Sequence, residues 1–97
     1  MAYSLHPEAE SELEDAFIYY REQAGSGLAR AFLGEFVRIA TLLSVNPRFG
    51  TPAGGITRRY PFRRFPYSLI YRAMPDGLRI LVVAHQHRRP GYWRGRN

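Results

Sequence analysis

The chain contains neither cysteine nor lysine. Without thiols it can form no disulfide bond and no thiolate metal site. Its 14 basic residues are all arginines, whose planar guanidinium groups bind carboxylates or phosphates through two parallel hydrogen bonds and do not act as general bases. A genome rich in G and C also favours arginine codons, so the missing lysine does not by itself establish a function.

Acidic residues are scarce in the second half of the chain, where Asp76 is the only one. Eleven arginines from Arg48 to Arg96 give residues 48–97 a net charge of +10, whereas residues 1–47 carry −4. The whole chain has a net charge of +6 and a pI near 10.3. A strongly basic surface attracts nucleic acid or an acidic protein. We therefore expect an anionic partner that meets the second half.

Long apolar runs are absent as well. No segment approaches the ~20 apolar residues that a membrane span needs, and no basic and then apolar leader begins the chain, so we expect a cytoplasmic protein. A length of 97 residues fits one domain over residues 1–97. The hydrophobic fraction of 45% and the charged fraction of 23% are typical of a folded globule.

Apolar residues recur with helical spacing in two segments of the first half. His6-Pro7 predicts the start of the first helix, the glycines of residues 25–27 predict a break, and Asn46-Pro47 predicts the end of the second helix. Residues 3–5 alternate as a short strand would, and the glycines and prolines of residues 47–55 predict a loop. The first half is thus predicted to form a helical hairpin.

The hydrophobic period changes to two in the second half. Residues 56–65 alternate arginine with aromatic side chains, and their prolines limit them to an edge or broken strand. Residues 67–73 and 78–85 are predicted strands joined by a hairpin turn at residues 75–77. The order predicts an α+β fold, with a short N-terminal strand, a two-helix hairpin and a three-stranded antiparallel meander, both helices packing on one face of the sheet.

Four segments of the chain resemble the RelE/ParE superfamily of toxins from bacterial type II toxin–antitoxin modules, most closely its ParE-like or plasmid-stabilisation branch. They are HPEAESEL, RRYPFRRFPYSLIYR, ILVVAHQHRR and PGYWRGR, and the resemblance covers almost the whole chain. It implies a small toxin held inactive by a cognate antitoxin whose acidic and apolar C-terminal segment wraps around it. It also implies two alternative targets, because RelE-type members cut messenger RNA on the ribosome whereas ParE-type members poison DNA gyrase.

RNA cleavage by its own 2′-hydroxyl needs a proton acceptor, a proton donor and fixed cations. The residues that could supply them here are Arg64, His85, His87, Arg88 and Tyr92. The chain departs from the RelE pattern at Ser68, where RelE has an arginine, and at residues 85–87, where RelE has a glycine followed by basic residues. We therefore expect a binding inhibitor of gyrase rather than an enzyme. A ribosome-dependent mRNA endonuclease and a non-toxic or decayed interaction module are the alternatives.

The antitoxin or target is expected to bind one positive groove formed by the last strands and the end of the chain, in a hetero-oligomer. Phe62 and Trp93 are the aromatic residues expected to contact it, while the other strand aromatics pack in the core. The residues assigned to the groove are Arg58, Arg59, Phe62, Arg63, Arg64, Arg88, Arg89, Trp93 and Arg94.

The acids between Glu8 and Asp15 point around a helix instead of converging, so we expect no metal. No glycine-rich phosphate loop or Ser-His-Asp spacing predicts a nucleotide cofactor or a hydrolase site. His85 is open to two interpretations, as a proton-transfer group or as a hydrogen-bonded residue that closes the sheet.

Overall fold

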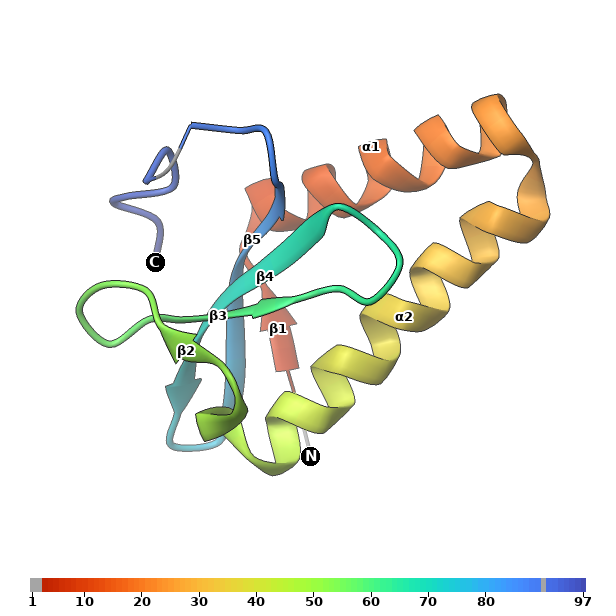
Figure 1. The fold of residues 1–97 in the computed structure, drawn as a ribbon. Helices are drawn as coiled ribbons and strands as arrows, with labels where there is room; N and C mark the ends of the chain where they lie inside the picture. Colours follow the sequence, from red (N-terminus) through yellow and green to blue (C-terminus); the bar gives the residue numbers. More distant parts are fainter. Residues whose placement is uncertain (1–2, 90) are drawn as a thin grey trace.

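The computed structural model describes residues 3–89 and 91–97 of the chain, and the predicted α+β fold is confirmed (Figure 1). The helical hairpin packs on one face of the sheet through the main hydrophobic core. Within the described residues, neither helix is long and apolar enough to cross a membrane. The elements in order are β1 (Tyr3–Leu5), α1 (Pro7–Ala24), α2 (Ser26–Val45), the 3-10 helix η1 (Pro47–Phe49), β2 (Thr51–Pro52), β3 (Arg58–Pro61), β4 (Tyr67–Met74) and β5 (Gly77–His85).

The two helices are separated by a single residue. His6 begins α1 as its N-cap, because its Nδ1 accepts a hydrogen bond of 3.1 Å from the backbone N–H of Glu8. Gly25 ends α1 with φ 95°, a left-handed conformation that glycine adopts without steric cost. Since α2 begins directly at Ser26, the predicted break over residues 25–27 is shorter than expected.

The sheet has five strands in the order β1-β5-β4-β3-β2, with β1 parallel to β5 and the remaining pairs antiparallel. The predicted meander forms its centre. The prediction of a plain loop over residues 47–55 is wrong, because η1 and the two-residue strand β2 lie there. A strand that short has no alternation to detect in sequence. The predicted strand over residues 56–65 is reduced to Arg58–Pro61.

A β-bulge gives the sheet a second apolar face. Ile70 lies opposite Val82 and Tyr71 lies opposite Ile80, so Leu81 is an extra residue on β5. Ile80 faces the helices, whereas both Leu81 and Val82 join a separate buried cluster on the other face. That face, which we call the open face of the sheet, must be covered by another part of the chain.

Phe62 belongs to the core between helices and sheet, so its assignment as a partner-binding residue is corrected. Only 7% of it is exposed. Its ring stacks on Phe32 of α2 with centroids 5.3 Å apart and an interplanar angle of 16°. Phe65 and Tyr67 pack edge-on around the same Phe32 ring. These rings hold the β3–β4 hairpin against α2.

Tyr71→Phe is expected to lower the free energy of unfolding by about 1–3 kcal/mol. Tyr71 is fully buried, and its hydroxyl accepts a hydrogen bond of 2.9 Å from the Gly50 N–H and donates one of 2.6 Å to the Pro47 carbonyl. Both backbone groups lose their partner in the variant. Urea denaturation measures the change. Tyr60→Phe is the control, since no hydrogen bond of its hydroxyl appears among the described residues, and equal losses in the two variants would contradict the prediction.

Candidate binding cleft beneath the C-terminal tail

The open face of the sheet is covered by the end of the chain, Gly91–Asn97, which we call the tail (Figure 1). Tyr92 and Trp93 pack against the cluster formed by Ile70, Leu81, Val82 and Ala84. Their two rings meet edge to face with centroids 5.5 Å apart. Burial of aromatic surface therefore holds the middle of the tail on β4 and β5.

An ion pair between Arg96 and Glu12 fixes the tail to helix α1. The guanidinium donates to both carboxylate oxygens at 3.0 Å and to the Leu81 carbonyl at 3.0 Å. The same carboxylate accepts hydrogen bonds of 3.0 Å from the Tyr92 hydroxyl and from the Val83 N–H. The Arg96 side chain is 10% exposed and that of Glu12 18%. We call Glu12, Tyr92 and Arg96 the latch.

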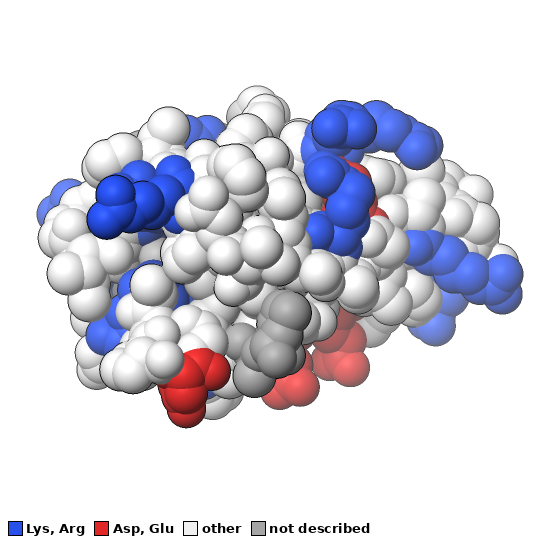
Figure 2. All heavy atoms as spheres, turned by 90° about the horizontal axis from the view of Figure 1, so that it is seen from below, with Lys and Arg blue, Asp and Glu red and all other residues white. Residues whose placement is uncertain are grey.

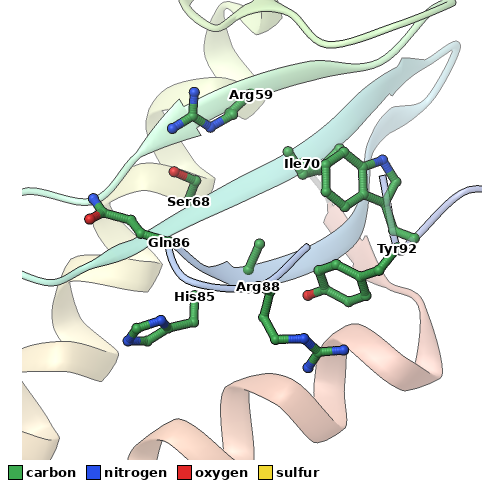
Figure 3. Close-up of a pocket in the computed structure, with 9 residues that line it drawn as sticks. Arg59, Ser68, Ile70, His85, Gln86, Arg88 and Tyr92 are labelled. Carbon is green, nitrogen blue, oxygen red and sulfur yellow. The ribbon is translucent and has the colours of Figure 1, made fainter. Parts of the chain in front are cut away.

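Two neighbouring hollows lie between the tail and the rest of the sheet, and we call them together the cleft. The inner one has a volume of about 320 Å³ and the outer one about 670 Å³. Both are lined by Arg59 and Trp93, so they adjoin along this pair. Figure 3 shows Ser68 of β4 in the inner hollow, between Arg59 and Gln86. No carboxylate is among the described residues that line either hollow.

The predicted binding arginines do not form one groove. Figure 2 shows arginine side chains in separate groups with uncharged surface between them. Arg59, Arg88 and Arg94 line the cleft. Arg58 instead donates a hydrogen bond of 2.7 Å to the Gly50 carbonyl, next to Tyr71 on the helix side of the sheet. Neighbouring residues of a strand face opposite sides, so Arg58 and Arg59 could not share a surface.

Arg63 and Arg64 lie outside the cleft, at the tip of the β3–β4 hairpin. Arg64 has φ 75°, an uncommon conformation for a non-glycine residue, and its guanidinium lies 5.6 Å from the centroid of the Phe65 ring. The backbone N–H of Arg63 donates a hydrogen bond of 2.7 Å to Glu35 of α2. The bond to Arg38 is the main reason that the pKa of Glu35 is lowered. Arg89 is exposed in the turn that follows β5.

The predicted nuclease residues are only partly brought together. His85, Arg88 and Tyr92 line the inner hollow, whereas Arg64 does not, and His87 is exposed in the turn after β5. Burial, assisted by the charge of His87, lowers the pKa of His85. Its Nδ1 accepts the His87 N–H at 3.1 Å, so the neutral ring carries its proton on Nε2.

His85 is therefore a hydrogen-bond donor in this arrangement and has no free lone pair to accept a proton. Its ring packs edge-on against Tyr67 with centroids 5.0 Å apart, consistent with a residue that closes the end of the sheet. The guanidinium of Arg88 lies 4.0 Å from the centroid of the Tyr92 ring. The Tyr92 hydroxyl is already bound to Glu12.

Four residues important for the cleft were not among the predicted site residues: Glu12, Ser68, Gln86 and Arg96. In the sequence, Ser68 stands where the RelE pattern has an arginine. It is 3% exposed, and its hydroxyl has no hydrogen-bond partner among the described residues. The same residues hold no group of three histidine, aspartate or glutamate side chains that could bind a metal ion.

A family model described as the ParE toxin of the type II toxin–antitoxin system, parDE, matches residues 3–90. The chain belongs to this ParE toxin family. A solved structure described as the chromosomal ParDE TA system from P. aeruginosa superposes with a TM-score of 0.75, over 88% of this chain and 95% of that one. Sequence identity is 18%, so this likeness shows the fold alone. No curated protein sequence matches the chain.

Arg96→Gln is expected to release the tail of this ParE-family toxin and to lower the free energy of unfolding by about 1.5–3 kcal/mol, because Glu12 and the Leu81 carbonyl lose a charged donor. Trp93 is the only tryptophan, so its emission should shift to longer wavelength as the tail exposes it. Arg89→Gln removes the same charge from an exposed residue and serves as control. Unchanged Trp93 emission in Arg96→Gln would rule out the latch.

Alkaline pH is expected to weaken the latch. Burial, with the charge of Glu12, raises the pKa of Tyr92 from 10.0 to about 12. A raised pKa means that the folded protein favours the neutral phenol, so this contribution to stability is complete below pH 10 and is lost as pH approaches 12. Trp93 emission should fall with a midpoint near pH 12, because the neighbouring tyrosinate quenches it. Tyr92→Phe should remove that transition, whereas Tyr60→Phe should retain it.

Proposed function

We propose that this chain is the toxin of a type II toxin–antitoxin module, that a cognate antitoxin neutralises it in the cytoplasm, and that the free toxin acts by binding and inhibiting DNA gyrase. Membership of the ParE family supports the toxin assignment. The solved structure of similar fold is described as a ParDE system, which supports an antitoxin as partner. The gyrase target rests on the likeness to the ParE branch, whose members poison this enzyme.

The state of His85 favours binding over RNA cleavage. A nuclease of the RelE type needs a group that takes the proton of the 2′-hydroxyl. His85 is the residue best placed for that task, yet its Nδ1 lone pair already accepts the His87 N–H. The Tyr92 hydroxyl donates its hydrogen bond to Glu12, and its raised pKa keeps the phenol neutral at physiological pH. Neither group is free to begin the reaction.

The position of Arg64 also favours binding over RNA cleavage. Stabilising a phosphorane requires cations fixed within hydrogen-bond distance of the reacting phosphate. Arg64 lies at the hairpin tip and does not line the inner hollow, and Ser68 stands where the RelE pattern has an arginine. Arg88 is thus the one arginine of the predicted nuclease set that lines the hollow. Its guanidinium also stacks on Tyr92.

The mRNA endonuclease remains the second candidate because His85, Arg88 and Tyr92 do line one hollow. A rotation of the imidazole that broke the bond to His87 would free a base there. The third alternative, a non-toxic or decayed interaction module, would retain the antitoxin surface without an effect on growth. These candidates differ in two assays.

Purified toxin is expected to inhibit supercoiling by purified gyrase, or to make cleaved DNA accumulate, while leaving messages on translating ribosomes intact. The first result follows if the toxin binds the enzyme, and the second follows because no proton acceptor is free at His85. Agarose gels of plasmid topoisomers and primer extension on messenger RNA measure the two. Cuts that disappear in His85→Ala would transfer the assignment to the endonuclease.

Two controls complete the experiment. A short acidic protein with a DNA-binding N-terminal domain, encoded beside this chain, should restore supercoiling when added in excess, as an antitoxin would. Induced expression in cells should arrest growth in the absence of that protein. If gyrase, messages and growth are all unaffected, the decayed-module alternative is correct.

A further inference from the structure

The outer side of the helical hairpin, which faces away from the sheet, has no other described element over it (Figure 1). Large apolar side chains remain exposed there. Leu33 and Val37 of α2 are 37% and 47% exposed, and they lie one helical turn apart on the same side of the helix. Because contact of apolar surface with water is unfavourable, this side of the hairpin is stabilised when another surface covers it.

Contacts of the two helices show that Leu33 and Val37 face the groove between α1 and α2. Glu35 binds the tip of the β3–β4 hairpin, and Leu33 lies about 200° from it around α2, on the flank toward α1. Glu12 binds the edge of β5, and half-buried Phe17 lies about 140° from it around α1, on the flank toward α2. Phe17, Leu33 and Val37 therefore form one surface, which we call the outer patch.

Gly34 lies next to the outer patch on the exposed side of α2. A methyl group at this position would meet no atom within 4 Å, so packing within the chain does not require glycine. Glycine destabilises a helix interior relative to alanine, but its missing side chain allows a second backbone to approach closely. The position therefore suits contact with another helix.

Charged side chains of opposite sign lie at the two ends of the outer patch. Arg21 of α1 and Arg30 of α2 lie near the closed end of the hairpin, on either side of the turn between the helices. Glu10 and Glu14 lie toward the open end, at a helical spacing that places them in line with Phe17. All four charged residues are exposed, and none makes an ion pair with a described residue. The outer side is thus positive at its closed end and negative at its open end.

Other charged side chains of the hairpin do not cancel this arrangement. Arg38 is paired with Glu35 of the same helix at 2.9 Å. Glu22 follows Asp15 by seven residues and so lies on the same flank of α1. That flank lines a hollow with the end of β5 and lies away from the outer patch. Both charges are therefore outside the stripe that runs from Glu10 to Arg21.

A surface with one positive and one negative end is complementary to itself after a two-fold rotation across the helix axes. This rotation places the closed end of one hairpin over the open end of the other, with α1 against α1. Glu10 then meets Arg21 of the second copy, and the two outer patches meet in the middle. The parallel arrangement would instead bring Arg21 and Arg30 of both copies together, which is repulsive. The charges therefore select the antiparallel arrangement.

We propose that a second copy of this chain binds the outer side of the hairpin, so that two hairpins pack antiparallel about a two-fold axis. The 18 residues of α1 span about 27 Å, and two adjacent helices are about 20 Å wide, so each copy contributes a footprint on the order of 500 Å². Stable interfaces bury about 800 Å² per partner. The dimer is accordingly reversible, with a dissociation constant on the order of 10 µM. This inference does not rest on the proposed function.

Sedimentation velocity of the full chain tests the proposal, at concentrations from about one tenth of this constant to about ten times this constant. The mean mass should rise from that of a monomer to that of a dimer. Val37→Gln should weaken association about tenfold, because it removes apolar surface from both copies. Ile56→Gln is the matched control, since Ile56 is 72% exposed and lies in the loop after β2, outside the hairpin. Urea midpoints show whether each variant is folded.

An exchange of charges tests the antiparallel arrangement. Arg21→Glu alone and Glu10→Arg alone should each weaken association about tenfold, because two attractive contacts per dimer become repulsive. A mixture of these two variants should associate again, since both contacts between unlike copies are attractive. Residues 10 and 21 are about 16 Å apart along α1 and do not pair within one copy. Arg89→Glu is the control, with the same change of charge at an exposed residue after β5.

A chain that stays monomeric over the whole concentration range would overturn the proposal. Equal weakening by Val37→Gln and Ile56→Gln would also overturn it, because association would then use another surface. A mixture of the two charge variants that stays monomeric would show that the hairpins do not pack antiparallel. None of these results bears on the gyrase and growth assays, so the two proposals fail separately.

Discussion

The carboxylate of Glu12 is the contact on which the arrangement of the cleft depends. Strand β1 ends at Leu5, so the edge of β5 beyond Ile80 has no neighbouring strand to satisfy its backbone groups. Glu12 accepts the Val83 N–H, and Arg96 donates to the Leu81 carbonyl. An ion pair between α1 and the tail thus replaces the missing strand. Because unpaired backbone groups are costly when buried, the sheet and the tail stabilise each other here.

The bulge at Leu81 explains why a tail is needed at all. By placing two successive apolar residues on the open face, it creates a cluster that water would otherwise reach. Tyr92 and Trp93 cover that cluster, and the latch keeps them there. The gap that remains between the tail and β3 is the cleft, whose wall includes Arg59. The fold therefore produces a binding surface as a consequence of how it protects its second apolar face.

Helices and turns can be predicted from the sequence because periodicity and turn residues determine them. Contacts between residues far apart in the chain cannot be predicted in this way. Helical spacing located both helices, and the turn at residues 75–77 located the central hairpin. Strand β2 is too short for any pattern, and the bond of Glu12 to Arg96 joins residues at opposite ends of the chain. Strand alternation separates Arg58 from Arg59, whereas net charge carries no side-chain direction and assigns both to one groove. Ser68 departs from the RelE pattern in the sequence, but its burial, and a hydroxyl without a partner among the described residues, follow only from the fold.

The division of charge along the chain has two causes that the structure separates. Part of it is internal complementarity: Glu8 and Glu12 of the acidic half bind Arg96 of the basic half. The arginines of the cleft are different, since no described carboxylate lines it. Arg96 is therefore part of the folded structure, whereas Arg59 and Arg94 stay exposed along the cleft, where the proposed partner would meet them.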